Sequence, residues 1–170
     1  MKEWIVIAGF AGIWKTTLAK KYSNVMDVES TPYKYDYSDL EKYDTEKVKW
    51  KEWRTLNKDF PMNYIEAIKK AQKEYDIVLV RIHPEEALPN YDKYWIDYYL
   101  CFPDKDALSE YENRFRGRWN NETYISKVLW DYDLRYKQFK ENSHKKIELR
   151  KWETLEDVLL KMGTPLIPKN

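Results

Sequence analysis

The residues of this chain that could do chemistry are concentrated near its N-terminus, in the stretch Gly9-Phe10-Ala11-Gly12-Ile13-Trp14-Lys15-Thr16-Thr17. The stretch matches the pattern G-x-x-x-x-G-K-[ST] at Gly9, Lys15 and Thr16. In such a loop, backbone N–H groups point at an anion, a lysine reaches the outer phosphates, and a hydroxyl takes Mg²⁺. We therefore predict a phosphate-binding loop over residues 9–17, with Lys15 as a catalytic residue and Thr16 as the metal ligand.

The loop departs from the pattern at Trp14, which stands where the second glycine belongs. At that position the backbone closes on the phosphates, and a side chain would crowd this approach. The indole could block the phosphate cradle, or it could swing out and leave the cradle partly usable. A strand, turn and helix without chemical meaning is the least favoured interpretation, because Lys15 and Thr16 follow an apolar strand-like run at the right distance.

A second cluster of chemically useful side chains is Arg114, Arg116 and Arg118. Guanidinium groups bind phosphate oxygens in forked geometry and can stabilise the charge of a phosphoryl group in transfer. Residues at i, i+2 and i+4 cannot all share one helical face. The spacing predicts that Arg114 and Arg118 project together while Arg116 points away, unless the helix ends at this point. The alternative is a solvated basic helix end.

Polar residues also follow two predicted strands. Asp27, Glu29 and Ser30 come at the end of a short apolar run over residues 24–28. Because the carboxyl ends of parallel strands line the ligand crevice of an α/β sheet, these three side chains are candidates for substrate binding. Alternatively, Asp27 or Ser30 only caps the next turn.

Arg81 and His83 end the most apolar strand, over residues 76–83, and are also candidate substrate-binding residues. A single histidine at a strand end is more often structural, so that interpretation of His83 stays open. No aspartate follows this strand where P-loop enzymes commonly hold the Mg²⁺ water. The sequence therefore leaves the metal site uncertain beyond Thr16.

Residues 33–60 are polar, aromatic and without clear periodicity, beginning with Tyr33. Long irregular insertions in compact domains usually have a function. We predict a flap that closes over a second substrate, with Tyr33 among the substrate-binding residues and with aromatic rings available for stacking on a base. The alternative is a solvated flap whose aromatic side chains only cover the core.

The remaining chain alternates apolar strand-like runs with helical patterns, which is typical of an α/β fold. We predict helices that begin near Asn63 in a capping box with Glu66, near Asp104, and at a cap formed by residues 154–157. A long helix is expected over residues 122–140, and strands over residues 95–102 and 146–149. The prediction is one domain over residues 1–170, with about five mainly parallel strands flanked by helices.

Length and composition are those of a single domain. The chain has 170 residues, 30 lysines and arginines against 29 acidic residues, and one cysteine, Cys101. A net charge near zero implies no strong field for a nucleic-acid polymer or an acidic membrane. A lone cysteine is expected to be a buried strand residue in a reducing compartment. No run approaches membrane-spanning length and no signal-peptide pattern is present, so we expect a cytoplasmic protein.

With these segments placed, the chain resembles small P-loop nucleotide kinases, and more closely the nucleotide-kinase-like proteins encoded in many bacteriophage genomes. The segments that carry the resemblance are the loop and residues 28–30, 63–68, 76–80, 96–100 and 155–159. It implies a P-loop NTPase or nucleoside monophosphate kinase-like fold that uses ATP and Mg²⁺ to phosphorylate a (deoxy)nucleoside monophosphate or similar small acceptor. Lys15 and Thr16 would bind phosphates and metal. Arg114, Arg116 and Arg118 match the lid arginines by region only, in a lid-like segment at about 112–122.

Two other functions stay open. Because of Trp14, the chain could be a catalytically inactive viral protein that binds and sequesters a nucleotide. A weaker alternative is a protein-interaction module that uses the aromatic flap. The base, the sugar and the oligomeric state are not predicted.

The resemblance also implies glycine at four tryptophan positions: 14, 95, 119 and 152. The composition agrees with this implication. The chain has eight tryptophans, which is many for an α/β domain, and only four glycines, which is few. One hypothesis is that these codons are UGA in a lineage that reads UGA as glycine. The rival hypothesis is a genuine Trp14 in a degenerate kinase fold that binds nucleotide without turnover.

Overall fold

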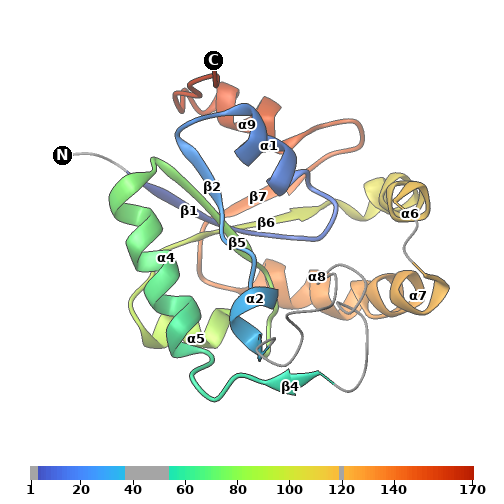
Figure 1. Ribbon diagram of the computed structural model, residues 1–170. Coiled ribbons are helices and arrows are strands. Elements are labelled where there is room, and N and C mark those ends of the chain that lie inside the picture. The colour runs from blue at the N-terminus through green and yellow to red at the C-terminus, as the bar shows by residue number, and fades with distance from the viewer. Residues whose placement is uncertain (1–3, 37–53, 119–120) are drawn as a thin grey trace.

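The computed structural model describes residues 4–36, 54–118 and 121–170 (Figure 1). Its centre is a five-stranded sheet of order β2-β5-β1-β6-β7 in which every neighbouring pair is parallel. The strands are β1 (Ile5–Gly9), β2 (Val25–Asp27), β5 (Ile77–Arg81), β6 (Tyr99–Pro103) and β7 (Lys146–Leu149). The predicted α/β fold class, with a mainly parallel five-stranded sheet, is confirmed.

Helices cover both faces of the sheet, which is why the central strands are continuous apolar runs. One face carries α1 (Lys15–Lys21) and α9 (Leu155–Lys161). The other carries α4 (Met62–Glu74), α5 (Leu88–Lys93) and α8 (Tyr132–Glu141), as Figure 1 shows. Along β5, Ile77 to Val80 are fully buried, and the buried Cys101 on β6 is the strand residue that the sequence predicted.

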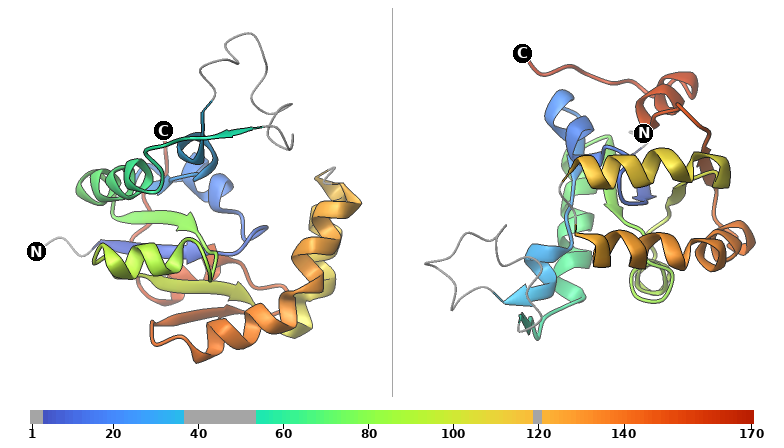
Figure 2. Two further views of the ribbon diagram at one scale, coloured as in Figure 1. Left: turned by 90° about the horizontal axis from the view of Figure 1, so that it is seen from below. Right: turned by 90° about the vertical axis from the view of Figure 1, so that its right-hand side faces the viewer.

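Two further helices lie beyond the carboxyl ends of β1 and β6. The 3₁₀ turn η2 (Lys105–Ala107), capped by the Asp104 side chain, leads into α6 (Leu108–Gly117). Helix α7 (Glu122–Trp130) packs beside α6 (Figure 2). These helices occupy most of the lid-like segment at about 112–122, of which residues 119 and 120 lie outside the described part of the chain.

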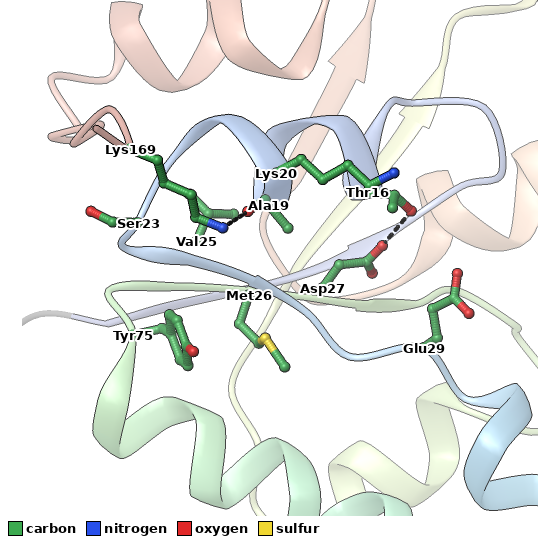
Figure 3. A pocket seen from close by; sticks show the side chains of 10 residues that line it. All are labelled: Thr16, Ala19, Lys20, Ser23, Val25, Met26, Asp27, Glu29, Tyr75 and Lys169. Carbon is green, nitrogen blue, oxygen red and sulfur yellow. Dashed lines mark hydrogen bonds between the residues drawn. The ribbon is translucent and has the colours of Figure 1, made fainter.

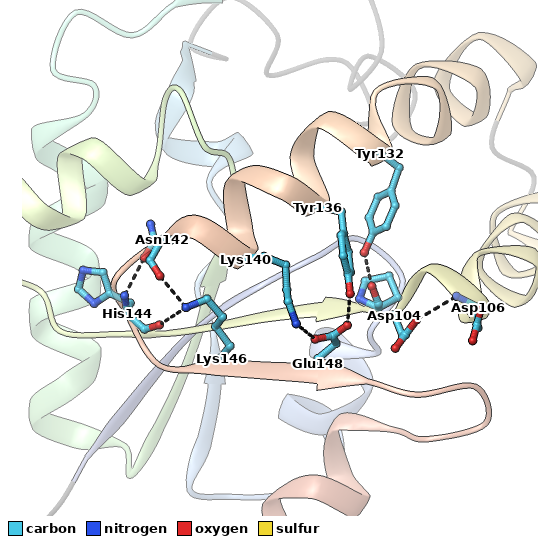
Figure 4. Close-up of polar contacts among 10 residues, drawn as sticks. Asp104, Asp106, Tyr132, Tyr136, Lys140, Asn142, His144, Lys146 and Glu148 are labelled. Atoms are coloured by element: carbon cyan, nitrogen blue, oxygen red, sulfur yellow. Dashed lines mark hydrogen bonds and ion pairs between the residues drawn. The ribbon is translucent and has the colours of Figure 1, made fainter.

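The single long helix predicted over residues 122–140 is wrong. The helix breaks at Asp131, whose φ of −89° and ψ of 7° are not helical, and gives α7 and α8. The break lets α7 pack on α6 while α8 packs on the sheet. Tyr132 of α8 donates to the Pro103 carbonyl, and Nζ of Lys140 lies 2.7 Å from the Glu148 carboxylate of β7. Figure 4 shows the Lys140 and Tyr136 side chains reaching from α8 to Glu148.

Two other predicted boundaries are corrected. The strand expected over residues 95–102 begins only at Tyr99, because Trp95 follows α5 in a left-handed conformation. Helix α4 begins at Met62 without the predicted capping box, because the Asn63 side chain donates instead to the Tyr33 carbonyl. The Thr154 cap of α9 is confirmed, with reciprocal bonds between Thr154 and Asp157.

The described ends of segment 33–60 are more regular than predicted. They contain the end of α2 (Thr31–Lys34), followed by an antiparallel pair of short strands, β3 (Tyr35–Asp36) and β4 (Thr55–Leu56). The rest of the predicted flap, residues 37–53, lies outside the described residues. Among the residues that the structure does describe, no helix is long and apolar enough to cross a membrane.

Candidate phosphate-binding site

The carboxyl ends of β1, β2 and β5 meet at one edge of the sheet. Gly9 at the end of β1 is in register with Arg81 on β5, and Asp27 on β2 is in register with Leu79, two residues before Arg81. The loop over residues 9–17 starts at this edge. The sheet therefore brings together the predicted loop, Asp27 and Arg81.

The loop is anchored by two buried apolar side chains, Phe10 and Ile13. A Cβ atom on Gly9 would lie 2.4 Å from Cδ1 of Ile13, so a larger residue here would require the Ile13 side chain to shift. The Phe10 ring packs edge-on against Tyr132 of α8, with centroids 5.2 Å apart. The loop is thus fixed to the core on its inner side, which leaves its outer side to a ligand.

Helix α6 holds the tip of the loop. Gly12 has a φ of 81°, and a Cβ atom there would meet the Phe115 ring at 3.0 Å and the Tyr111 ring at 3.2 Å. The Gly12 carbonyl accepts a hydrogen bond of 3.1 Å from Nη1 of Arg114. The loop and α6 therefore pack against each other as one unit.

The loop presents backbone donors without partners. Among the described residues, the N–H groups of Ala11, Gly12, Ile13 and Trp14 donate to no other group. Backbone N–H groups in folded proteins are nearly always hydrogen-bonded, to protein, water or a ligand. Consecutive unpaired donors of this kind can form a concave anion-binding nest.

Lys15 is half-buried behind the loop. Its Nζ donates to the carbonyl oxygens of Gly9 at 2.9 Å and Phe10 at 3.0 Å. Burial lowers the pKa of Lys15, and the Asp27 carboxylate opposes this shift. An anion bound on the loop would strengthen that opposition, because it also favours the charged ammonium.

Thr16 and Asp27 form the pair that sequence reasoning missed. Thr16 Oγ1 donates to Oδ2 of Asp27 at 2.8 Å, across the start of α1 (Figure 3). The sequence had predicted Thr16 as a metal ligand and Asp27 as a substrate contact. The two lie 11 residues apart, and only the β1–α1–β2 crossover brings them together.

The Thr16 and Asp27 oxygens suit Mg²⁺. This ion prefers oxygen ligands and is commonly held by one or two carboxylates together with substrate phosphates and waters. Within the described residues, no group of three or more His, Cys, Asp or Glu could hold a metal. The pair therefore fits an ion that takes its remaining ligands from a nucleotide and water.

Glu29 is exposed just beyond Asp27, and both line a pocket between α1 and β2 (Figure 3). The other end of this pocket is lined by Ser23, Tyr75 and Lys169, far along α1 from the loop. Only the end of the pocket with Thr16, Asp27 and Glu29 has the side chains that the sequence predicted to bind metal or substrate.

Arg114 and Arg118 face the loop. The Arg118 guanidinium lies 4.7 Å and that of Arg114 5.7 Å from the centre of the Trp14 ring. Trp14 is exposed to 39%, so its indole is neither buried in the core nor free of the site. The side chain lies under the two arginines that would otherwise face a bound phosphate.

Arg116 lies on the other face of α6. It forms ion pairs with Glu112, at 2.9 Å, and with Glu122. The structure therefore places Arg114 and Arg118 together and Arg116 apart, as the helical spacing predicted. Its geometry gives Arg116 no contact with the loop.

The predicted acceptor residues cluster near the end of β5. Buried Ser30 and half-buried Arg81 line a narrow cavity with Glu86, which forms ion pairs with Lys34 at 2.6 Å and Arg81 at 3.5 Å. Tyr33 is not among the lining residues. Its ring packs against Tyr64, with centroids 5.6 Å apart, which matches the alternative in which it covers the core.

His83 follows β5 with its Nδ1 atom buried and without a hydrogen-bond partner among the described residues. Burial lowers its pKa, and the charges of Arg81 and Arg135 lower it further. Burial raises the pKa of Tyr124. The positive charges of Arg118, Arg81 and Arg135 oppose this rise. The positive charge of Arg135 on α8 therefore acts on both of these side chains. Sequence reasoning missed it, because one arginine in a long helical pattern carries no signal of its own.

Comparisons with known proteins bear on the fold. No protein-family model matches the chain, and no curated protein matches it. Among solved structures, the chain is similar to the Deinococcus radiodurans tunicamycin resistance protein, at 17% sequence identity with a TM-score of 0.52. The match covers 98% of this chain and 99% of that chain.

At 17% identity this likeness concerns the fold and leaves activity open. The parallel sheet and the structural neighbour support the predicted α/β fold, with the loop at the end of β1. The kinase activity that the resemblance implies stays a prediction. The bacteriophage part stays a prediction.

Proposed function

We propose that the chain binds a nucleoside triphosphate, ATP with Mg²⁺, and transfers its terminal phosphoryl group to a nucleoside monophosphate or a similar small acceptor. The observation that carries the proposal is the convergence of four groups on one loop. Unpaired amides, the Lys15 ammonium, the Thr16–Asp27 oxygen pair and the Arg114 and Arg118 guanidiniums all adjoin residues 9–17.

Phosphoryl transfer requires mainly positioning and neutralisation of charge. The loop amides would bind the phosphate oxygens, and Lys15 would exchange its two carbonyl partners for the outer phosphates. Thr16 and Asp27 would hold Mg²⁺, which when bound supplies positive charge to the phosphates. Arg114 and Arg118 would meet the negative charge of the group in transfer.

The acceptor would bind at the end of β5. Arg81 is half-exposed there, and His83 Nδ1 offers an unpaired polar atom beside it. Arg81, Arg118 and Arg135 together would favour an anionic acceptor such as a monophosphate. Ser30, which is buried in the neighbouring cavity, would contact the part of the acceptor that lies away from the phosphate.

A second candidate function is nucleotide binding without turnover. The position of Trp14 favours it, because the guanidiniums of Arg118 and Arg114 lie 4.7 Å and 5.7 Å from the centre of its ring and so face the indole. In that case the chain would hold a nucleotide in the cytoplasm of its host and release it unchanged.

Binding and turnover distinguish these functions. ATP affinity would be measured by calorimetry with Mg²⁺, and phosphoryl transfer would be assayed with the common nucleoside monophosphates and with tunicamycin as acceptors. Turnover with any acceptor supports the kinase, and binding without turnover supports the second candidate. If neither the chain with Trp14 nor its Trp14→Gly variant binds any triphosphate, both proposed functions are contradicted.

Asp27→Asn is expected to raise the Mg²⁺ concentration needed for half-maximal triphosphate binding about tenfold or more, as loss of a metal-orienting carboxylate does elsewhere. The amide keeps an oxygen for the Thr16 hydrogen bond but lacks the charge. Glu74→Gln is the matched control, since Glu74 is an exposed carboxylate on α4 that does not line this pocket. An unchanged Mg²⁺ dependence in Asp27→Asn would remove Asp27 from the metal site.

A further inference from the structure

Three tryptophans adopt a backbone conformation that side chains normally avoid. Trp14, Trp95 and Trp152 have φ values of 68°, 62° and 65°. In the described part of the chain, no other residue except glycine has a positive φ. A left-handed conformation brings Cβ close to the following carbonyl oxygen, and for a bulky residue it is a true outlier. Asparagine and aspartate, which tolerate it better, hold none of these positions.

Trp95 occupies the glycine position of a helix C-terminal motif. After α5, the Ile96 N–H donates to the Tyr91 carbonyl and the Trp95 N–H donates to that of Asp92. This is the Schellman pattern, whose left-handed residue is usually glycine. The same pattern occurs after α9. There the Thr164 N–H donates to the Leu159 carbonyl and the Gly163 N–H donates to the Leu160 carbonyl. There the left-handed residue is Gly163, with a φ of 72°.

Trp152 occupies the glycine position of a tight turn. The Glu153 N–H donates to the Arg150 carbonyl at 3.1 Å, which closes a four-residue turn with Lys151 and Trp152 at its centre. Only the second central residue has positive φ, as in a type II turn, and that position favours glycine.

At positions 95 and 152, packing gives no reason for tryptophan. The Trp95 side chain is 93% exposed and that of Trp152 is 77% exposed. Trp14 stands at the loop position where a glycine lets the backbone approach phosphate. The three sites share no element and no partner, only a conformation suited to glycine.

We propose that glycine is the residue at positions 14, 95 and 152 when the protein is made by its own host. The codons would be ones that this host reads as glycine and that another genetic code reads as tryptophan, such as UGA. The proposal extends to Trp119, which lies outside the described residues. It is independent of the proposed function, because Trp95 and Trp152 are not part of the loop.

Stability measurements test the proposal on the folded protein. Trp95→Gly and Trp152→Gly should each raise the Tm by about 2–4 °C, through relief of one left-handed residue in a domain of this size. Trp130→Gly is the matched control: Trp130 is 87% exposed but lies in α7 with ordinary helical geometry, so glycine there should lower the Tm. Equal losses of stability in all three variants would overturn the proposal.

Trp14→Gly should tighten triphosphate binding about tenfold or more, the value of one recovered charge-assisted hydrogen bond. The reason is steric, since the loop amides bind an anion only at about 2.9 Å. Calorimetry with ATP and Mg²⁺ measures this. If the glycine variants are more stable at 95 and 152 but Trp14→Gly binds no better, the proposed function fails while the glycine assignment stands.

The gene and the native protein give the direct test. The expected result is UGA at codons 14, 95, 119 and 152, and peptides from the native host whose masses fit glycine at each site. The codon UGG at positions 14, 95 and 152, or native peptides that contain tryptophan there, would overturn the proposal.

Discussion

Replacing Lys15 by alanine is expected to lower the affinity for ATP about ten- to a hundredfold. The ammonium would make charge-assisted hydrogen bonds to the outer phosphates, each worth about 1.5–3 kcal/mol, and about 1.4 kcal/mol corresponds to a factor of ten. The fold should survive the change. Burial already disfavours the charged form of Lys15, so alanine removes a partly desolvated charge from the loop.

Calorimetry measures this loss of ATP affinity in two backgrounds, the chain with Trp14 and its Trp14→Gly variant. The second background matters, because Trp14 can weaken binding before Lys15 is changed. Lys21→Ala is the matched control, because Lys21 is an exposed lysine on the same helix whose partner is Glu156 of α9, 2.6 Å away. If a folded Lys15→Ala protein binds ATP as tightly as its parent in both backgrounds, the loop is not a triphosphate site.

The fold and the loop could be predicted because both are local in the sequence. A buried parallel strand needs a continuous apolar run, and residues 77–80 are such a run. The loop needs a strand, a turn with glycine and a lysine at fixed spacing, and these are adjacent along the chain. The cap of α9 could be predicted for the same reason, since Thr154 and Asp157 lie within one helical turn.

The parts that could not be predicted depend on contacts between distant segments. Asp27 acquires its partner Thr16 through the crossover between β1 and β2. The break at Asp131 follows from the packing of α7 and α8 on different surfaces, while the local pattern there is helical throughout. The left-handed conformation of Trp95 opposes the propensity of its residue type, and only the resemblance implied a glycine at that position.

Replacing Arg114 or Arg118 by alanine is expected to lower kcat and kcat/KM together, by about 10²–10³-fold for the residue that meets the developing charge. Both guanidiniums face the loop, and Arg114 also donates to the Gly12 carbonyl. A donor that meets charge mainly in the transition state affects turnover more than binding. The measurement is steady-state kinetics with the acceptor that gives turnover, on the Trp14→Gly background as well as on the printed chain.

Arg116→Ala supplies the internal control for these variants. Arg116 belongs to the same helix and carries the same charge, yet it is paired with Glu112 and Glu122 on the opposite face. Its loss should leave kcat near that of the parent, because an exposed ion pair contributes little to stability and Arg116 does not reach the loop. If Arg114→Ala, Arg116→Ala and Arg118→Ala all keep the parental kcat, the cluster is a basic helix end. Phosphoryl transfer would then have to depend on Lys15, the loop amides and the Thr16–Asp27 pair alone.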